Sequence, residues 1–173
     1  MQCWRDKYKF NFWRPIIGIR NANDDTIGGT AGFEDPDWVQ LGAPRTNSNK
    51  PGINPAFPAY PSGHATVATA AFTAAVDMLN IPEDREYPFM SDEFNGVNED
   101  EEGVPRPKLV RTMSFATAMK ENERSRVYIG VHWDFDCTEG SKLGREIAAD
   151  IVAMFPGETE PEPGMDADAP SST

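Results

Sequence analysis

The sequence has little that would tie the chain to a disulfide framework, a nucleic acid or a membrane. Only two of its 173 residues are cysteines, Cys3 and Cys137, which are too few for such a framework, and we expect unpaired thiols. The 16 basic residues against 28 acidic ones give a net charge of −12, which repels nucleic acids and anionic membranes. No apolar run approaches the roughly 20 residues of a transmembrane helix. Residues 1–12 lack the apolar region of a signal peptide.

What the sequence does have is a series of helical patterns separated by long irregular segments. The helical patterns cover residues 1–13, 65–79, 109–123 and 137–155, and the irregular segments cover residues 21–58 and 82–108. In the last helix, apolar residues at every fourth position predict a buried stripe of Leu143, Ile147, Ile151 and Phe155. Strand signals are weak throughout, so we expect an all-α helical bundle with long irregular loops.

We expect one helical domain over residues 1–155, followed by a disordered, acidic and proline-rich tail over residues 156–173. The first helix has no capping residue and carries a dense set of aromatic residues: Trp4, Tyr8, Phe10, Phe12 and Trp13. Aromatic residues this dense surround a helix instead of lining one face, and exposed apolar surface of this kind marks an interface. We therefore expect a missing N-terminal helical half or self-association.

The segment Pro61-Ser62-Gly63-His64 directly precedes the helical run of residues 65–79 and predicts the start of that helix. A helix N-terminus presents unpaired backbone N–H groups and the positive end of the helix dipole. Gly63 lets an anion approach its N–H closely, Ser62 adds a hydroxyl, and His64 exchanges protons near neutral pH. These features predict an anion pocket with an acid–base group. The alternative is an ordinary helix cap at Ser62.

Two cationic residues of the first expected helix could reach the same anion. Lys7 and Arg14 are two helical turns apart, about 10.5 Å along the axis, and lie on one face. Long side chains at this spacing can approach one central anion from two sides. Each residue alone also fits a solvated helix surface.

A third segment carries Arg126 and His132. The two would point ~120° apart on an unbroken helix, but Gly130 between them predicts a break that lets both face one pocket. Asp134 and Asp136 follow and could orient the His132 ring, which fixes its tautomer and raises its basicity. A buried structural histidine is the alternative. Together with the other two segments, however, these residues predict a site for a tetrahedral oxyanion.

These three segments resemble the signature shared by vanadium-dependent haloperoxidases and type 2 phosphatidic acid phosphatases. Its parts occur in order as Lys7-x6-Arg14-Pro15, Pro61-Ser62-Gly63-His64 and Ser125-Arg126-x5-His132-x3-Asp136. The flanking Phe12-Trp13 and Phe57-Pro58-Ala59-Tyr60 are similar to the soluble haloperoxidase branch. The lack of membrane helices and the long separation between the second and third parts distinguish the chain from the lipid phosphatases.

The resemblance implies oxidation of a halide by hydrogen peroxide at a histidine-bound vanadate, with an organic molecule as a further acceptor. It implies that His132 ligates vanadium, that His64 is the acid–base for peroxide, and that Asp136 orients the imidazole. The vanadate oxygens would be held by Lys7, Arg14, Ser62, Gly63 and Arg126, and phosphate would compete for the same site. Trp4 and Phe57 match positions that line the halide pocket of the chloride-oxidising branch. A secreted full-length relative is compatible with this assignment.

Two alternatives stay open. A soluble acid phosphatase would use the same oxyanion site, with His132 as the nucleophile that forms a phospho-histidine and His64 as the acid for the leaving group. A truncated and catalytically incompetent relative would keep the signature without turnover, because family haloperoxidases are longer and carry a helical bundle ahead of the first part.

Overall fold

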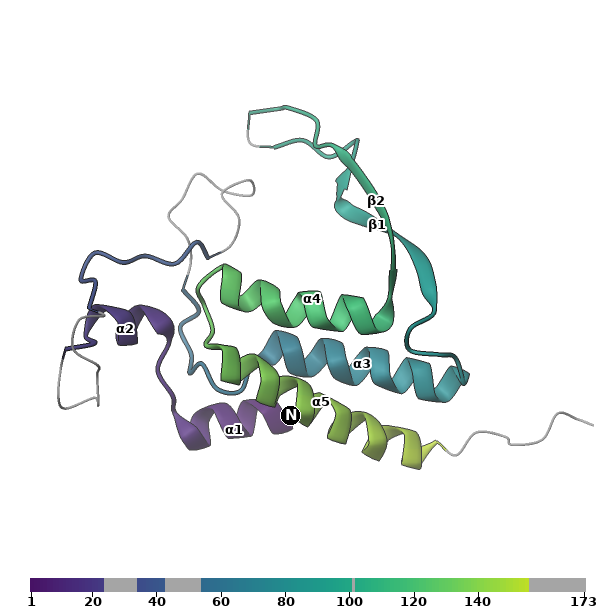
Figure 1. The fold of residues 1–173 in the computed structure, drawn as a ribbon, viewed down its shortest axis with the longest axis horizontal. Helices are drawn as coiled ribbons and strands as arrows, with labels where there is room; N and C mark the ends of the chain where they lie inside the picture. Colours follow the sequence, from purple (N-terminus) through teal and green to yellow (C-terminus); the bar gives the residue numbers. More distant parts are fainter. Residues whose placement is uncertain (24–33, 43–53, 101, 156–173) are drawn as a thin grey trace, which may run out of the picture.

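The computed structural model describes residues 1–23, 34–42, 54–100 and 102–155 (Figure 1). In these ranges the elements are α1 (Gln2–Phe10), α2 (Pro15–Arg20), α3 (Gly63–Leu79), β1 (Glu86–Asn95), β2 (Lys108–Ser114), α4 (Phe115–Tyr128) and α5 (Asp134–Met154). The predicted helical bundle is confirmed. The predicted tail of residues 156–173 and parts of the predicted loop of residues 21–58 lie outside the described residues.

The bundle is built around α3, which packs along α5 and also contacts α4 and α1 (Figure 1). Small residues of α3 are buried at this contact: Ala65, Thr66, Thr69 and Ala74. The facing residues of α5 are equally small: Cys137, Gly140, Gly144 and Ala148. Because helix separation depends on the side chains at the contact, these residues allow the two backbones to approach closely.

The predicted stripe of α5 is therefore wrong. Leu143 and Ile147 are half-buried, Ile151 is 36% exposed and Phe155 is 61% exposed. The helix turns its small residues toward α3, because only small side chains fit between the two backbones, and its larger apolar residues lie beside that contact. Helical periodicity predicted the helix but assigned its buried face to the wrong residues.

A two-stranded antiparallel hairpin, β1–β2, occupies a region in which we expected only loop and helix. Its strands pair from Glu86 opposite Ser114 to Met90 opposite Val110, and the register is irregular between Met90 and Asn95. Figure 1 shows the hairpin extending beyond α4, away from the helical layers. Phe115 anchors its base, with ring centroids 5.2 Å from both Phe72 and Tyr87. The expectation that strands are absent is thus corrected.

The break between the first two helices follows from its residues. Asn11, in the left-handed conformation with φ 48°, caps α1 and donates its backbone N–H to the Lys7 carbonyl. Arg14 is extended at the N-cap of α2, and Pro15 occupies the first helical position, where its missing N–H costs nothing. The two cationic residues of the first segment therefore lie on different elements and not on one continuous helix.

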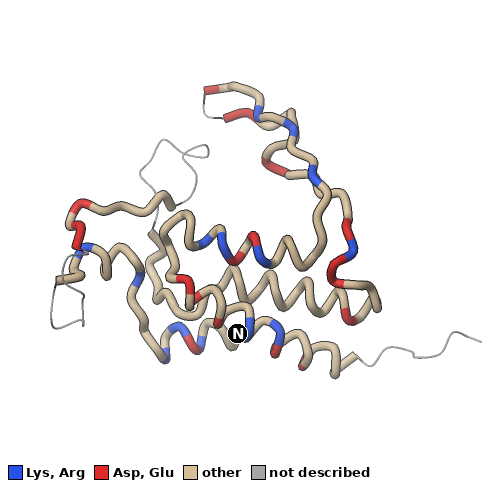
Figure 2. The backbone as a smooth tube through the Cα atoms, in the orientation of Figure 1, with Lys and Arg blue, Asp and Glu red and all other residues tan. Residues whose placement is uncertain are grey.

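Among the described residues, no helix is long and apolar enough to cross a membrane. Acidic and basic positions are interspersed along α4 and the hairpin (Figure 2). Both cysteines are buried and unpaired, as expected.

Candidate oxyanion site

The helix α3 begins at the predicted segment, and Ser62 has the capping role that was the alternative interpretation of this segment. Ser62 is the N-cap, with φ −69° and ψ 117°, and its Oγ accepts from the Ala65 N–H at 3.4 Å. Ser62 is fully buried, and its own N–H donates to the Asp136 carbonyl at 2.8 Å, which ties this turn to α5. Gly63 is the first helical residue and is half-buried, and His64 is exposed. The N–H groups of Gly63 and His64 precede the first helical hydrogen bond, from Thr66 to Ser62, and the start of a helix favours an anion.

His132 lies in the α4–α5 connection, at the centre of a buried hydrogen-bond chain. Its Nδ1 is 3.0 Å from Asp136 Oδ2, and its Nε2 is 3.2 Å from Arg14 Nη1. A carboxylate only accepts and a guanidinium only donates, so the proton is on Nδ1 and Nε2 is the acceptor. The break at Gly130, where φ is +73°, brings His132 toward Arg14. Asp136 thus orients the imidazole, whereas Asp134 pairs with Arg124 at 2.6 Å instead.

Asp136 is fully buried at the start of α5. Its Oδ2 also accepts from the Trp133 backbone N–H at 3.0 Å and caps the helix. Its Oδ1 has no hydrogen-bond partner among the described residues. A buried carboxylate oxygen without a partner is costly, and a catalytic role or a bound water or ion are among the explanations for such a group.

Arg14 and Lys7 are buried, and both donate to backbone carbonyls of residues 57–61. Lys7 Nζ donates to the carbonyls of Pro58, Ala59 and Pro61 at 3.0, 2.9 and 2.6 Å. Arg14 Nε donates to the Phe57 carbonyl at 2.9 Å. An ammonium has three N–H donors, so in this arrangement Lys7 holds the loop with all of them. A direct bond from Lys7 to an anion would have to replace one of these carbonyls.

Arg14 Nη1 also donates to the Val131 carbonyl at 2.7 Å, next to His132. Among the described residues, neither Lys7 nor Arg14 makes an ion pair. Two buried cations are therefore satisfied by hydrogen bonds without being neutralised by carboxylates in contact.

Arg126 and His64 lie at the more open side of the site. Arg126 is half-buried, and its Nε is 3.1 Å from Ser125 Oγ. Although His64 is exposed, the atoms packed around its ring partly desolvate the imidazole and lower its pKa, and the charges of Arg126, Lys7 and Arg14 lower it further. Direct contacts show that the three signature segments meet: Lys7 donates to the Pro61 carbonyl, Arg14 contacts His132, and the Ser62 N–H donates to the Asp136 carbonyl.

Burial sets the protonation of the other groups. It lowers the pKa of Lys7 to about 8, with the charge of Arg14 acting in the same direction, and the pKa of Arg14 to about 10. It also lowers the pKa of His132, against the hydrogen bond to Asp136, which acts to raise it. Burial raises the pKa of the Cys137 thiol to about 11, so this thiol stays protonated at neutral pH. Near pH 7 both histidines are therefore neutral while Arg14 and most of Lys7 are charged.

The two aromatic residues expected at the halide pocket lie together. Trp4 and Phe57 make an edge-on contact, with ring centroids 4.9 Å apart. The Phe57 ring also lies 5.3 Å from Lys7 Nζ and 4.9 Å from Arg14 Cζ. Phe57 thus packs against both cations, and the neighbouring Trp4 is 47% exposed.

Sequence reasoning missed two residues that hold the signature segments together. Asn122 of α4 donates to the His64 carbonyl at 3.0 Å, and Ser125 Oγ donates to the Asn122 carbonyl at 2.7 Å. Trp133 Nε1 donates to the Trp13 carbonyl at 3.0 Å. Trp133 directly follows His132, and this adjacency was the one available signal. No pattern in the sequence pointed to Asn122.

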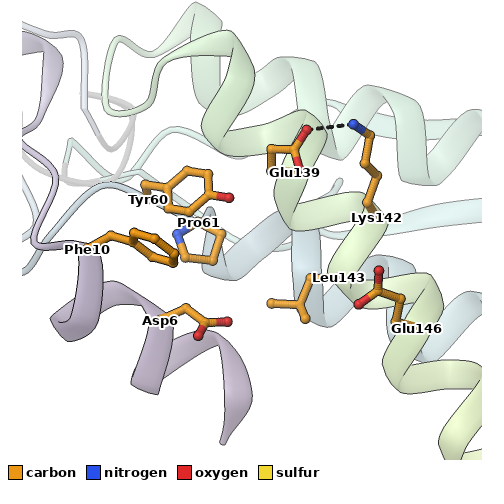
Figure 3. Close-up of a pocket in the computed structure, with 8 residues that line it drawn as sticks. All are labelled: Asp6, Phe10, Tyr60, Pro61, Glu139, Lys142, Leu143 and Glu146. Carbon is orange, nitrogen blue, oxygen red and sulfur yellow. Dashed lines mark hydrogen bonds and ion pairs between the residues drawn. The ribbon is translucent and has the colours of Figure 1, made fainter.

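A separate pocket of about 180 Å³ lies between α1 and α5 (Figure 3). It is lined by Asp6, Phe10, Tyr60, Pro61, Glu139, Lys142, Leu143 and Glu146. Glu139 pairs with Lys142 at 2.6 Å, and the Phe10 and Tyr60 rings meet edge-on with centroids 5.2 Å apart. None of the predicted site residues lines this pocket, and its carboxylates make it unsuitable for an anion.

Comparison with known proteins agrees with this geometry. The model of the VCPO second helical-bundle domain matches residues 1–157. The chain belongs to this family. Vanadium chloroperoxidase of Curvularia inaequalis is 40% identical over an alignment of 167 residues, which covers 77% of this chain and 25% of that protein. The resemblance to haloperoxidases that the signature implied is thereby confirmed.

Solved structures show the same relationship. The crystal structure of a bacterial vanadium-dependent iodoperoxidase has a TM-score of 0.58 and 27% identity, and covers 87% of this chain and 29% of that one. The crystal structure of a holo-type bacterial vanadium-dependent chloroperoxidase has a TM-score of 0.62 and 19% identity, and the alignment covers 88% of this chain and 32% of the chloroperoxidase chain. At this identity the likeness shows only that the fold is shared. The chain spans about a quarter to a third of the length of these relatives.

Proposed function

We propose that this chain carries the oxyanion site of a vanadium-dependent haloperoxidase and takes part in the oxidation of halide by hydrogen peroxide. The observation that carries the proposal is the buried His132, whose acceptor nitrogen Nε2 lies beside Arg14, a buried cation that makes no ion pair among the described residues. A structural ion pair would place a carboxylate there. The nitrogen lone pair of His132 beside cations instead suits an oxyanion whose central atom accepts one nitrogen ligand.

The donor set fits vanadate, a phosphate analogue. In the described part of the chain, no group of three His, Cys, Asp or Glu residues could hold a metal cation, so a bare metal ion does not fit. A single imidazole together with cationic N–H donors and a helix N-terminus suits a tetrahedral oxyanion. When bound to one histidine, vanadate supplies a centre that activates hydrogen peroxide toward halides.

The chain's own residues would contribute in distinct ways. Asp136 holds the His132 ring so that Nε2 is presented as a neutral ligand. Arg14, Arg126 and the first turn of α3 would bind the oxyanion, and Lys7 would stabilise it through its charge while holding the 57–61 loop. His64 is exposed and neutral near pH 7, so it can accept a proton from hydrogen peroxide at its imidazole. Trp4 and Phe57 limit the access of water to the cations.

Halogenation of a phenolic dye with bromide and hydrogen peroxide, before and after addition of orthovanadate, tests this proposal. We expect turnover only after vanadate is added, and none in a His132→Ala variant. Vanadate-independent turnover, or equal turnover of the wild type and the variant, would contradict it. The relatives described above are haloperoxidases. Hydrolysis of p-nitrophenyl phosphate would reveal the alternative activity of a phosphatase.

A further inference from the structure

Two segments that supply the innermost site residues meet through three contacts. Arg14 Nη1 contacts the Val131 carbonyl and His132 Nε2 at 2.7 and 3.2 Å. The third contact runs in the opposite direction, because Trp133 Nε1 donates to the Trp13 carbonyl at 3.0 Å. The residue after His132 is thus bonded to the residue before Arg14.

These contacts differ in whether an anion can displace them. The lone pair of His132 Nε2 serves either Arg14 or a bound oxyanion, but not both. The bond between Trp133 and Trp13 involves no group that would touch the anion. It can therefore hold the two segments at the same separation with or without a ligand.

Gly18 of α2 shows that the Trp133 ring has a fixed place. A Cβ atom at Gly18 would lie 2.7 Å from Trp133 Cζ2 and 3.1 Å from Trp13 Cζ3. The first distance is shorter than real Cβ contacts and the second is tighter than most of them, so a side chain at this position would displace the indole. The ring centroids of Trp13 and Trp133 are 6.4 Å apart. The indole is thus confined by packing as well as by its hydrogen bond.

We infer that Trp133 is a positioning residue for the oxyanion site: its indole N–H, bonded to the Trp13 carbonyl, sets the distance between Arg14 and His132. The inference rests on the proposed function, because it assigns Trp133 a role in that same site. Trp133 does not touch the reacting atoms and acts through Arg14.

The test is a double-mutant cycle on anion binding, with inorganic phosphate as the probe and calorimetry at pH 7 as the measurement. Trp133→Phe keeps a ring but removes the N–H, and loss of one hydrogen bond should raise the phosphate Kd by about threefold to tenfold. Arg14→Lys should also weaken binding. In the Arg14→Lys background, Trp133→Phe should add less than about twofold, because residues that act through one another are not additive.

Two further variants make the cycle specific. Gly18→Ala retains the indole N–H but displaces the ring, and it should raise the Kd as Trp133→Phe does. If Trp133→Phe does not fold, the Gly18→Ala variant tests the same inference. Tyr128→Phe removes one hydroxyl from an exposed side chain at the last residue of α4 and is the matched control, with an expected Kd within about twofold of wild type. Far-UV circular dichroism checks that each variant is folded.

Two results would overturn the inference. Folded Trp133→Phe and Gly18→Ala variants with wild-type affinity would do so, and so would additive effects in the cycle. A wild-type chain that binds no phosphate would overturn the proposed function as well. If the wild type halogenates the dye while folded Trp133→Phe binds phosphate normally, only the positioning role fails.

Discussion

Gly140 allows α5 to approach the turn that carries Ser62, and an alanine there should affect both stability and anion binding. A Cβ at this position would lie 2.7 Å from the Ser62 carbonyl oxygen and 3.2 Å from the Ser62 backbone nitrogen. Both neighbours are backbone atoms, so the helices must separate. Overpacking of this kind costs about 3 kcal/mol, and the higher helix propensity of alanine returns about 1 kcal/mol.

The expected net loss for Gly140→Ala is therefore about 2 kcal/mol, or about 4–8 °C in Tm for a chain of this size. Gly144→Ala is the matched comparison. Its Cβ would lie 2.7 Å from the Thr66 carbonyl oxygen, one turn farther from the site. It should lower the Tm by a similar amount and leave phosphate affinity within about twofold, whereas Gly140→Ala should also weaken phosphate binding.

Thermal melts followed by circular dichroism, and calorimetric titration of the folded variants with phosphate, measure these two effects. Glu146→Ala, at an exposed position of α5, controls for the helix itself and should change stability by less than about 0.5 kcal/mol. Equal phosphate affinities for the Gly140 and Gly144 variants would refute the argument that α5 positions the Ser62 turn. An unchanged Tm in both would refute the close packing.

Three further predictions concern the site and the surface. His132→Ala should abolish tight vanadate binding, whereas His64→Ala should remove turnover and keep much of the binding, and equal loss of vanadate affinity in both would contradict these roles. Burial lowers the pKa of Lys7 to about 8, so its charge is lost as pH rises through that value; phosphate affinity should fall between pH 7 and 9.5. A Lys7→Met variant should bind phosphate more weakly at pH 7, and its affinity should not show this fall with pH. If the variant and the wild type have the same dependence of phosphate affinity on pH, Lys7 is not the titrating group. The aromatic residues Tyr8 and Phe10 of α1 are 64% and 53% exposed and should cause self-association, which light scattering would detect. The double variant Tyr8→Ser, Phe10→Ser should self-associate less. A monodisperse wild-type monomer would contradict this prediction.

The helix starts and breaks around the site could be predicted because their signals are local. Ser62 was expected to precede a helix and is its N-cap. Gly130 was expected to interrupt the helix between Arg126 and His132, and it adopts a positive φ. Each prediction depended on the conformation of one residue and not on a distant partner.

The hairpin could not be predicted because its stability comes from tertiary contacts. Pro88 lies within β1, and a proline inside a run argues against a strand. The base of the hairpin is fixed by Phe115 of α4, which contacts Phe72, Tyr87 and Phe89. The residues of each pair are far apart in the sequence and meet only in the folded chain. No local sequence pattern therefore predicts these contacts.

The same limit explains what was missed at the site. The signature predicted that Lys7 would face the oxyanion, but it could not predict the carbonyls of Pro58, Ala59 and Pro61 that receive its three donors. Every residue has a carbonyl, so sequence does not mark those that converge. Carbonyls satisfy the hydrogen bonds of the ammonium without cancelling its charge, so burial still lowers the pKa of Lys7, and this lysine loses its proton more easily than a solvated one. An interior that holds Lys7 and Arg14 in this way remains positive within a chain of net charge −12, and a bound oxyanion would relieve that imbalance.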